Sequence, residues 1–440
     1  MAVKVAKFGG SSVADGIQIR KIKEIIDADQ ERKFIVVSAP GKRFDGDNKI
    51  TDILYMCKAS IERNLPYNQL FQVVVDRFRA LQADLGTNIN LDAEFQSIRE
   101  NLEQGCSLDY IASRGEYLNA LVISNFLDYD FVDTASLILF DSAGKLMRQE
   151  TDESLKRELS KHEKAVIPGF YGTAEEDGQV ITFSRGGSDI TGALVARAVE
   201  ASVYENWTDV SGFLMADPRI VPSPKQISTI SYKELRELSY MGASVLHEDA
   251  IYPARMSDIP INIRNTNEPE NPGTMITAEP EQDGESIITG IAGSKDFVVI
   301  AIYKNMMSSD RGFMRRLFGV LEDFNIGFEH LPSGIDTVSV VVSKEDLAKC
   351  KEEFINALQV QLSPDSLQCH EDIALIATVG SRMSNKPGVS AKLFTALADA
   401  NINIRMIDQG SSEMNIIVGV ENNRFEDAIR AIYSMFERSN

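Results

Sequence analysis

Two glycines and two hydroxyl residues beside a lysine form the first part of the chain that could do chemistry. The run Lys7-Phe8-Gly9-Gly10-Ser11-Ser12 follows the alternating residues 3–6, which predict a β-strand. Glycines let backbone N–H groups approach an anion, a helix predicted from Asp15 onward adds its positive end, and the lysine supplies a full charge. The pattern indicates an anion site. An ordinary strand-to-helix turn, in which the glycines serve only the bend, stays open as the alternative.

A second glycine pair follows the apolar strand predicted at residues 180–183. Arg185 can grip a carboxylate or phosphate through two parallel hydrogen bonds, and the glycines at 186 and 187 expose backbone donors. Asp189 can orient a lysine, a substrate ammonium group or a metal. Simple capping of the next helix by Ser188 or Asp189 is the alternative.

A third strand, beginning at residue 203, ends at Thr208 and Asp209. We expect these two residues to contact a ligand, and Arg219 could reach nucleotide phosphates. Trp207, the only tryptophan, is expected to pack in the core. His247 is expected to be a packing residue rather than a catalyst.

These stretches require a scaffold that brings strand ends together. Strands predicted at residues 34–39, 131–133, 137–140, 165–170 and 261–264 alternate with helical segments, a pattern typical of a mostly parallel α/β sheet that is covered on both faces. Ligands bind beyond the carboxyl ends of such strands, where Gly9, Ser38 and Gly169 lie. Residues 261–264 are expected to close the sheet, and the Pro- and Gly-rich residues 267–285 to form a domain boundary.

The composition excludes several classes of protein. The chain has 440 residues, enough for two or three domains. Its 45 basic and 65 acidic residues give a net charge of -20, which disfavours nucleic-acid binding. The apolar runs are too short for a membrane span and no leader peptide is evident, so a soluble cytoplasmic protein is expected. The four cysteines have no paired short spacing, which argues against disulfides and a zinc site.

The C-terminal third contains an internal repeat. Eight residues recur at an offset of 76, as from Gly312 to Gly388. Each copy predicts a strand, a helix after the glycine, a strand after Asn-Ile, a further strand and a helix, which is the βαββαβ order of a ferredoxin-like module. The glycines at 312 and 388 open helices whose N–H groups could receive a small carboxylate. A duplicated dimerisation module without a ligand is the alternative.

In combination, the motifs resemble the aspartate kinases of the amino acid kinase family, over essentially the whole chain. The motifs that carry the resemblance are Lys7-Phe8-Gly9-Gly10-Ser11-Ser12, Arg114-Gly115-Glu116, Gly186-Gly187-Ser188-Asp189, Trp207-Thr208-Asp209-Val210, Asp217-Pro218-Arg219, Lys386-Pro387-Gly388-Val389 and residues 409–416.

The resemblance implies a three-layer α/β/α amino acid kinase domain at residues 1–280 with a mostly parallel central sheet. It also implies two regulatory ACT modules of the ferredoxin-like βαββαβ type, at residues 287–365 and 366–440, which can interdigitate. The chain ends after these modules, so the homoserine dehydrogenase domain of bifunctional relatives is expected to be absent.

The activity implied is ATP-dependent phosphorylation of the β-carboxylate of L-aspartate to 4-phospho-L-aspartate, the first step towards lysine, threonine and methionine. Mg²⁺ would be carried by the nucleotide, with no metal held by the protein itself. Carried over residue by residue, Lys7 and Asp189 are catalytic. Lys7 would neutralise the transferring phosphoryl group, and Asp189 would position Lys7 and the substrate. Aspartate would be held by Ser38, Thr51, Glu116, Arg185 and Ser188, with Arg185 on the α-carboxylate and Glu116 near the ammonium group. The nucleotide would be held by Gly9, Gly10, Ser11, Thr208, Asp209 and Arg219.

Two positions depart from the family pattern. Ser244 stands where relatives usually have a lysine that contacts ATP phosphates, and Leu214 stands where they often have a nucleotide-contacting tyrosine. The loop at residues 41–49 is longer and more charged than expected, and no role is assigned to it.

The resemblance also implies feedback inhibition by an end-product amino acid, with lysine expected first and threonine second. The effector site is predicted at Gly312, Phe313, Met314, Glu329 and Asp336. The carboxylates at 329 and 336 could pair with the side chain of lysine, or be solvated surface charges. ACT modules work by pairing, so we expect a homodimer or a larger assembly.

Two other functions stay open. A glutamate-type amino acid kinase shares the glycine-pair architecture, but would not ordinarily carry this ACT tandem. A catalytically weak amino-acid sensor is suggested by Ser244.

Overall fold

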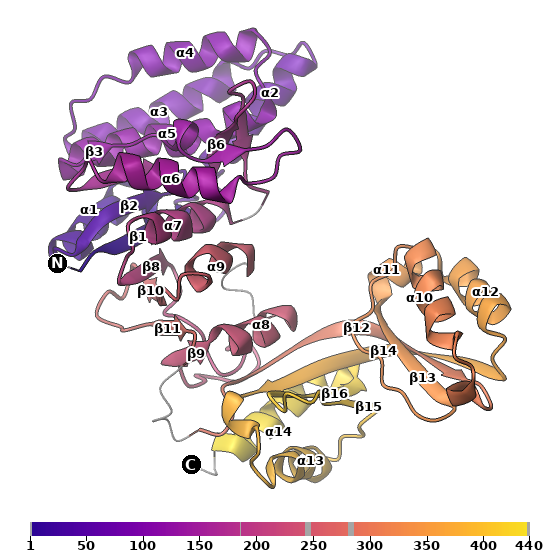
Figure 1. The fold of residues 1–440 in the computed structure, drawn as a ribbon. Coiled ribbons are helices and arrows are strands. Elements are labelled where there is room, and N and C mark those ends of the chain that lie inside the picture. Colours follow the sequence, from indigo (N-terminus) through magenta and orange to yellow (C-terminus); the bar gives the residue numbers. More distant parts are fainter. Residues whose placement is uncertain (1, 185, 243–247, 280–285, 438–440) are drawn as a thin grey trace. The chain divides into compact units, whose positions relative to one another are not determined.

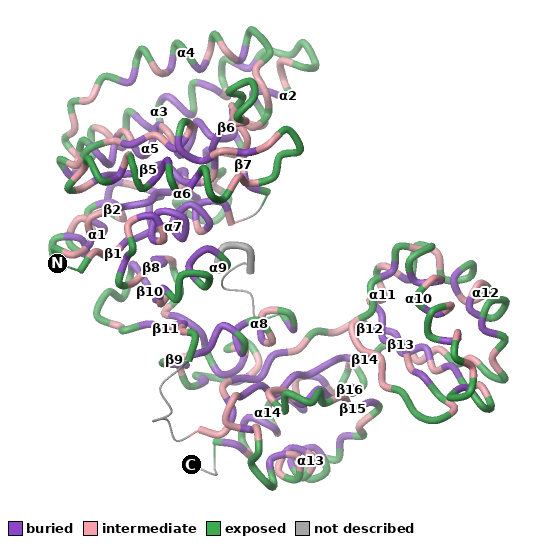
Figure 2. Tube along the Cα trace, in the orientation of Figure 1, coloured by how far each residue is buried: buried purple, intermediate pink, exposed green. Residues whose placement is uncertain are grey.

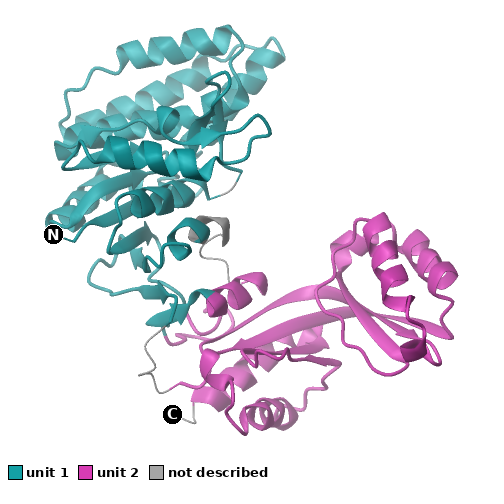
Figure 3. Ribbon diagram, viewed as in Figure 1, with its two compact units in different colours: residues 1–213, 226–232, 245–280 teal, residues 214–225, 233–244, 281–440 magenta. Residues whose placement is uncertain are grey.

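The structure is a computed structural model that describes residues 2–184, 186–242, 248–279 and 286–437. It divides into two compact units, residues 1–213, 226–232 and 245–280 in the first and residues 214–225, 233–244 and 281–440 in the second (Figure 3). None of the described helices is long and apolar enough to cross a membrane.

The first unit is built on an eight-stranded sheet. In spatial order its strands are β3 (Asp130–Phe131), β5 (Ala165–Pro168), β2 (Arg32–Val37), β1 (Lys4–Phe8), β8 (Val203–Thr208), β10 (Ile261–Asn265), β11 (Thr274–Thr277) and β9 (Thr229–Ser231). All neighbouring pairs are parallel except β10 and β11. The mostly parallel α/β sheet expected from the sequence is confirmed.

Helices cover both faces of this sheet (Figure 1). One face packs against α1 (Gly16–Asp27), α2 (Ile50–Glu62), α3 (Asn68–Leu85), α4 (Asp92–Glu103) and α5 (Leu108–Leu127), and the other is covered by α7 (Gly187–Ala198), with α6 (Arg148–Leu159) and α9 (Glu248–Arg255) beside it. Along β1, Ala6 and Phe8 belong to the core shared with α1 to α5, so the alternation of a strand turns Lys7 toward α7. Figure 2 shows the strands buried between these layers.

Two expectations about the sheet are wrong. Residues 261–264 do not close it, because β11 and β9 lie beyond β10. β11 comes from residues 267–285, where the sequence predicts a domain boundary; its β-branched residues suit a strand, and the prolines at 269, 272 and 280 lie outside it. In addition, β4 (Leu139–Phe140), β6 (Tyr171–Ala174) and β7 (Val180–Thr182) form a separate three-stranded sheet.

The second unit contains a five-stranded antiparallel sheet. Its order is β13 (Thr337–Ser343), β12 (Gly290–Tyr303), β14 (Ser366–Val379), β16 (Asn415–Glu421) and β15 (Met406–Asp408). Its helices are α10 (Phe313–Asp323), α11 (Lys344–Ala348), α12 (Lys351–Leu362), α13 (Val389–Asp399) and α14 (Phe425–Glu437), and most of α8 (Tyr232–Tyr240) also belongs to this unit.

The two repeats share their longest strands. β12 and β14 have 14 residues each. The first half of β12 pairs with the second half of β14, and the second half of β12 pairs with β13 and with the first half of β14. The sheet is therefore continuous through both ferredoxin-like modules, whose boundaries at 287–365 and 366–440 stay a prediction.

One strand expected in the first repeat is missing. After Ile326 the chain makes only isolated bridges, His330 with Val341 and Ser333 with Val338, whereas the second repeat forms β15. Pro332 has no backbone N–H to donate, which interrupts the ladder at this point. Short 3₁₀ turns lie at Gly10–Val13, Thr134–Ser136, Met307–Ser309, Ser381–Met383 and Asn422–Arg424.

Candidate active site

Lys7, Asn206 and Asp189 meet at the carboxyl edge of the large sheet. Lys7 and Asn206 are register partners on the parallel strands β1 and β8. The Lys7 ammonium lies 2.5 Å from Asp189 Oδ1 and donates to Asn206 Oδ1 at 3.4 Å. Asn206 Nδ2 donates to the same Asp189 oxygen at 2.8 Å. The two residues that the sequence singles out as catalytic are thus brought together.

This arrangement fixes the position of the lysine. Lys7 is only 7% exposed, and its ammonium would be costly to bury without the carboxylate of Asp189. Asp189 lies in the first turn of α7, where the helix dipole favours a negative charge. Because Asn206 is hydrogen-bonded to both Lys7 and Asp189, the Lys7 ammonium is held near the end of β1.

Asn206 is a residue of this site to which the sequence analysis assigns no role. Its contribution depends on its alignment with Lys7 across two strands. The signal that could have found it is period-two alternation: Trp207 and Glu205 face the α1 side, where the Trp207 indole N–H donates to Glu205 at 2.9 Å, so residue 206 must face α7. Trp207 is 1% exposed, and its core-packing role is confirmed.

The N-terminus of α7 is open. Its N-cap residue is Gly186, with a φ of 58°, and no side chain among the described residues caps it. Ser188 and Asp189 lie inside the helix, so the simple-capping alternative is wrong. Gly169 allows this helix start to approach the end of β5, because a Cβ there would lie 2.7 Å from the Ser188 side chain. Arg185 lies outside the described residues.

The glycine turn after β1 differs in one respect from the expectation. The N–H of Gly9 donates to the carbonyl oxygen of Trp207 at 3.0 Å. The helix that starts at Gly16 is capped by Asp15, whose carboxylate accepts from the N–H of Gln18 at 2.9 Å. The positive end of the α1 dipole is therefore already compensated by the carboxylate of Asp15. The open helix N-terminus at this edge belongs to α7, beside Lys7, and not to α1.

A buried acceptor pair lies on α5 near the end of β2. Glu116 is 6% exposed, and burial raises its pKa to about 8 although the backbone N–H of Ala39 donates to it. Asn119, one turn further on, is fully buried and donates from Nδ2 to the carbonyl oxygen of Ser38 at 2.7 Å. Glu116 Oε2 and Asn119 Oδ1 have no partner among the described residues. Two buried, unpartnered acceptors suit a bound ammonium group.

The other predicted residues lie in three places. Thr51 is the second residue of α2, which follows the loop after β2. Thr208 ends β8, and its hydroxyl contacts Asp209 Oδ1 at 3.2 Å. Arg219 belongs to the second unit, where its exposed guanidinium pairs with Asp217 at 2.6 Å. The departure at Ser244 and the prediction for His247 concern residues outside those described.

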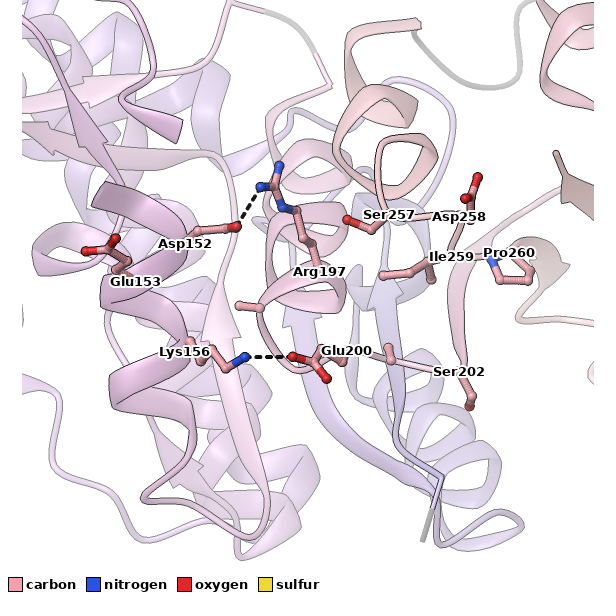
Figure 4. Close-up of a pocket in the computed structure, with 12 residues that line it drawn as sticks. Asp152, Glu153, Lys156, Arg197, Glu200, Ser202, Ser257, Asp258, Ile259 and Pro260 are labelled. Atoms are coloured by element: carbon pink, nitrogen blue, oxygen red, sulfur yellow. Dashed lines mark hydrogen bonds and ion pairs between the residues drawn. The ribbon is translucent and has the colours of Figure 1, made fainter. Parts of the chain in front are cut away.

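The pocket in Figure 4 is not part of this site. It lies at the opposite edge of the sheet, because Ser202 and Pro260, which line it, immediately precede β8 and β10. Two ion pairs cross it, Asp152 with Arg197 at 2.7 Å and Lys156 with Glu200 at 2.6 Å (Figure 4). Four of its charged side chains are thus paired with each other.

Three of the predicted effector residues, at positions 312–314, lie at the start of α10. Phe313 is buried in the core of the first repeat, and Met314 is partly exposed. The N–H of Gly312 donates to Asp310 at 3.3 Å, so a carboxylate of the chain itself already occupies this helix start. Burial, together with the hydrogen bond that its hydroxyl donates to Glu329, raises the pKa of Tyr240 to about 12. The carbonyl oxygen of Asp336 accepts from the N–H of Lys304 at 2.9 Å.

Metal-binding and disulfide chemistry find no support in the described part of the chain. No group of three or more His, Cys, Asp or Glu side chains there could hold a metal ion. The four cysteines are free thiols.

Comparisons with known proteins agree with this geometry. Residues 2–265 match the model of the amino acid kinase family, and residues 376–436 match an ACT domain. Aspartokinase 3 of Bacillus subtilis is 35% identical over 451 residues, covering 99% of this chain and 98% of that protein. The crystal structure of an aspartate kinase from Clostridium acetobutylicum superposes with a TM-score of 0.91 at 48% identity, covering 99% of this chain and 100% of the other.

Crystal structures of aspartokinase III from E. coli are also similar, at 25% identity. The complex with aspartate and ADP gives a TM-score of 0.73 and covers 99% of this chain and 100% of the other. The complex with lysine and aspartate gives 0.74 and covers 99% of each chain.

The parallel sheet, the lysine at the end of its first strand and the open helix N-terminus opposite it define a phosphotransferase, and the chain belongs to the amino acid kinase family. Within that family it is an aspartate kinase, an enzyme that transfers a phosphoryl group to the carboxyl group of aspartate.

Proposed function

We propose that this chain uses ATP to phosphorylate the β-carboxylate of L-aspartate, releasing 4-phospho-L-aspartate and ADP at the entry to lysine, threonine and methionine synthesis. The observation that carries the proposal is the Lys7 ammonium held by Asp189 and Asn206 next to the open start of α7. The complex of E. coli aspartokinase III with aspartate and ADP supports the choice of substrates.

These groups suit phosphoryl transfer to a carboxylate. The β-carboxylate is ionised at neutral pH, so no general base is required to activate it. The protein's part is to position the two substrates and to neutralise charge, which Lys7 and the N–H groups of the glycine turn and of α7 can do. Mg²⁺ would arrive on the nucleotide.

The remaining roles follow the position of each residue. Glu116, with Asn119 beside it, would accept from the ammonium group of aspartate, and Arg185 would hold its α-carboxylate. Ser38, Thr51 and Ser188 would complete that half of the site. The nucleotide half is proposed to consist of Gly9, Gly10, Ser11, Thr208, Asp209 and Arg219.

A hydroxamate assay tests the function. Protein, Mg-ATP and hydroxylamine are incubated with aspartate, glutamate or other amino acids, and the trapped acyl hydroxamate is measured. We expect product with aspartate only. Product with glutamate instead would identify a glutamate-type kinase, and absence of product with every acid would identify a sensor.

We further propose that lysine is the feedback effector and that Glu329 pairs with its side-chain ammonium. The complex of E. coli aspartokinase III with lysine supports this choice over threonine. Titration with each amino acid should show inhibition by lysine. Inhibition by threonine with no response to lysine would reverse the assignment.

Replacing Glu329 with Gln should raise the lysine concentration for half-inhibition about tenfold or more, because a charge-assisted hydrogen bond contributes roughly 1.5–3 kcal/mol. Dose–response curves of the kinase reaction measure the shift. Glu322→Gln, an exposed substitution on α10, serves as the control and should leave the curve in place. An unchanged curve for Glu329→Gln would show that this carboxylate is only a surface charge.

We also propose that the second unit pairs with another copy of the chain. Its surface exposes large apolar side chains, among them Met306 (67% exposed) and Ile335 (77% exposed), together with Phe318 and Phe328, whose tilted rings have centroids 5.7 Å apart. Light scattering on the purified protein should give a mass of at least two chains.

A further inference from the structure

Arg77 is a buried arginine whose guanidinium contacts three separate parts of the first unit. It lies on α3, is 6% exposed, and donates from Nη2 to the carbonyl oxygens of Ala14 at 3.0 Å and Gly41 at 2.8 Å. Its Nη1 donates to Asp47 Oδ2 at 2.9 Å. One side chain therefore joins the turn after β1, the turn after β2 and the loop at residues 41–49.

Asp47 is the anchor of this loop. Arg43 donates to its carboxylate from the backbone N–H at 3.1 Å, from Nε at 2.8 Å and from Nη2 at 3.0 Å. These bonds and the pairing with Arg77 hold the pKa of Asp47 well below its usual range. Residues 44–46, which separate Arg43 from Asp47, are exposed. The side chain of Asp47 points inward and is only 11% exposed. The charged loop that had no role in the sequence is thus fixed at its base.

The two turns that Arg77 joins are in direct backbone contact. The N–H of Gly41 donates to the carbonyl oxygen of Gly10 at 2.9 Å, and a Cβ at Gly41 would lie 2.6 Å from that oxygen. The N–H of Ile50, the first residue of α2, donates to the carbonyl oxygen of Pro40 at 3.3 Å. A displacement of the loop would therefore reach both the glycine turn and the start of α2, where Thr51 lies.

We propose that Arg77, together with Asp47, is a positioning residue for phosphoryl transfer. Its guanidinium holds the loop at residues 41–49 against the glycine turn, so that the anion-binding N–H groups of the turn and the hydroxyl of Thr51 keep their places around the reacting carboxylate. The inference rests on the proposed function, since it specifies which residues keep that site assembled. Arg77 acts through these neighbours, because its Nη1 and Nη2 donate to groups of the chain itself.

The test uses three variants and a matched control in the full-length protein. Arg77→Met removes the charge and all three hydrogen bonds while retaining side-chain bulk. Arg77→Lys retains a charge for Asp47 but cannot reach both carbonyl oxygens in the same fork geometry. Asp47→Asn loosens the loop without altering α3. The control is Arg79→Met, a change on the exposed face of the same helix, where Arg79 pairs only with Asp92 at 3.2 Å.

Two measurements separate positioning from stability. The first is the steady-state kinetics of hydroxamate formation. Arg77→Met should lower kcat/KM for aspartate about 10–100-fold with both kcat and KM affected, the scale expected when reacting groups shift by about 1 Å. Asp47→Asn should show a smaller change in the same direction, Arg77→Lys should recover only part of the loss, and Arg79→Met should stay within twofold. The second is the rate of tryptic cleavage after Lys42 and Arg43, followed by mass spectrometry, which should rise at least tenfold in Arg77→Met and Asp47→Asn.

Specific outcomes would overturn the inference. Arg77→Met and Asp47→Asn with normal kinetics despite faster loop cleavage would show that the loop does not support the site. Unchanged cleavage would show that Arg77 does not hold the loop. Where Arg77→Met fails to fold by circular dichroism, a folded Asp47→Asn variant with wild-type kinetics would also reject it. Failure of the proposed function is recognised separately, because the wild type would then form no aspartyl hydroxamate while the cleavage pattern still reports on Arg77.

Discussion

Replacing Lys7 with Ala should lower the turnover of aspartate phosphorylation about 10²–10³-fold, the effect of removing one preorganised charge-stabilising group. The ammonium is held by Asp189 and Asn206 before any substrate arrives, so it needs little reorganisation to meet the charge on the transferring phosphoryl group. KM for aspartate should change less than kcat, because the interaction strengthens in the transition state. Steady-state hydroxamate formation measures both quantities.

The control for this prediction is Lys4→Ala. Lys4 lies on the same strand but at its amino end, where it pairs with Asp29 at 2.7 Å. Its loss should leave turnover within a few-fold of wild type. Near-normal turnover in the Lys7 variant, with an unchanged circular dichroism spectrum, would exclude this lysine as the catalytic cation.

Ser244→Lys adds a second test. If Lys7 compensates for the lysine missing at 244, Lys7→Ala should be better tolerated in the Ser244→Lys background.

Aspartate affinity should increase with pH up to about pH 8 and then level off. Burial raises the pKa of Glu116 to about 8, so its carboxyl group is largely protonated at pH 7 when the site is free. The ammonium group of aspartate favours the ionised form, and binding must then release a proton. Below pH 8 the apparent affinity should fall by up to about tenfold per pH unit. Glu116→Gln should abolish this dependence and weaken binding about 10–100-fold at pH 8.

The raised pKa of Glu116 also changes how the free energy of unfolding depends on pH. A carboxyl group with a raised pKa keeps its proton in the folded protein after the unfolded chain has lost it, so its contribution to stability is complete below about pH 4.5 and is lost as the pH rises through about 8. Relative to the wild type, Glu116→Gln should therefore gain stability between pH 5 and pH 8 in urea unfolding. Glu100→Gln, at an exposed position on α4, should track the wild type in both experiments. A pH-independent KM in the wild type would contradict the role of Glu116.

The sequence predicted the parts of the site that depend on local order. Lys7 lies near the end of a strand of the parallel sheet, and Asp189 lies in the first turn of the helix that packs on that strand. Asn206 required the register between β1 and β8, which no single segment encodes. Arg77 could not be predicted, because a charged residue on an amphipathic helix is normally exposed, and only the packing of α3 against the loop buries it.

The errors in the fold have a similar origin. The prolines at 269, 272 and 280 suggested a domain boundary, but none of them falls within Thr274–Thr277, so β11 keeps every backbone N–H for pairing with β10 and β9. In the first repeat, by contrast, Pro332 falls where a strand would have to donate, and the repeat loses the strand that its second copy retains. The residues common to both repeats specify the helices and the core. Residues that differ between the repeats, such as Pro332, determine whether the outer strand forms.

The long strands β12 and β14 join the two repeats into one cooperative structural unit. Each of these strands belongs to both modules, so a shift in register within one module would be transmitted along 14 residues to the other. The pair should therefore unfold in a single transition, and the amide protons of both strands should exchange together in the native state. A truncation after residue 365 would remove β14 and leave one edge of β12 unpaired along its whole length, and we expect such a fragment to aggregate instead of acting as an independent sensor.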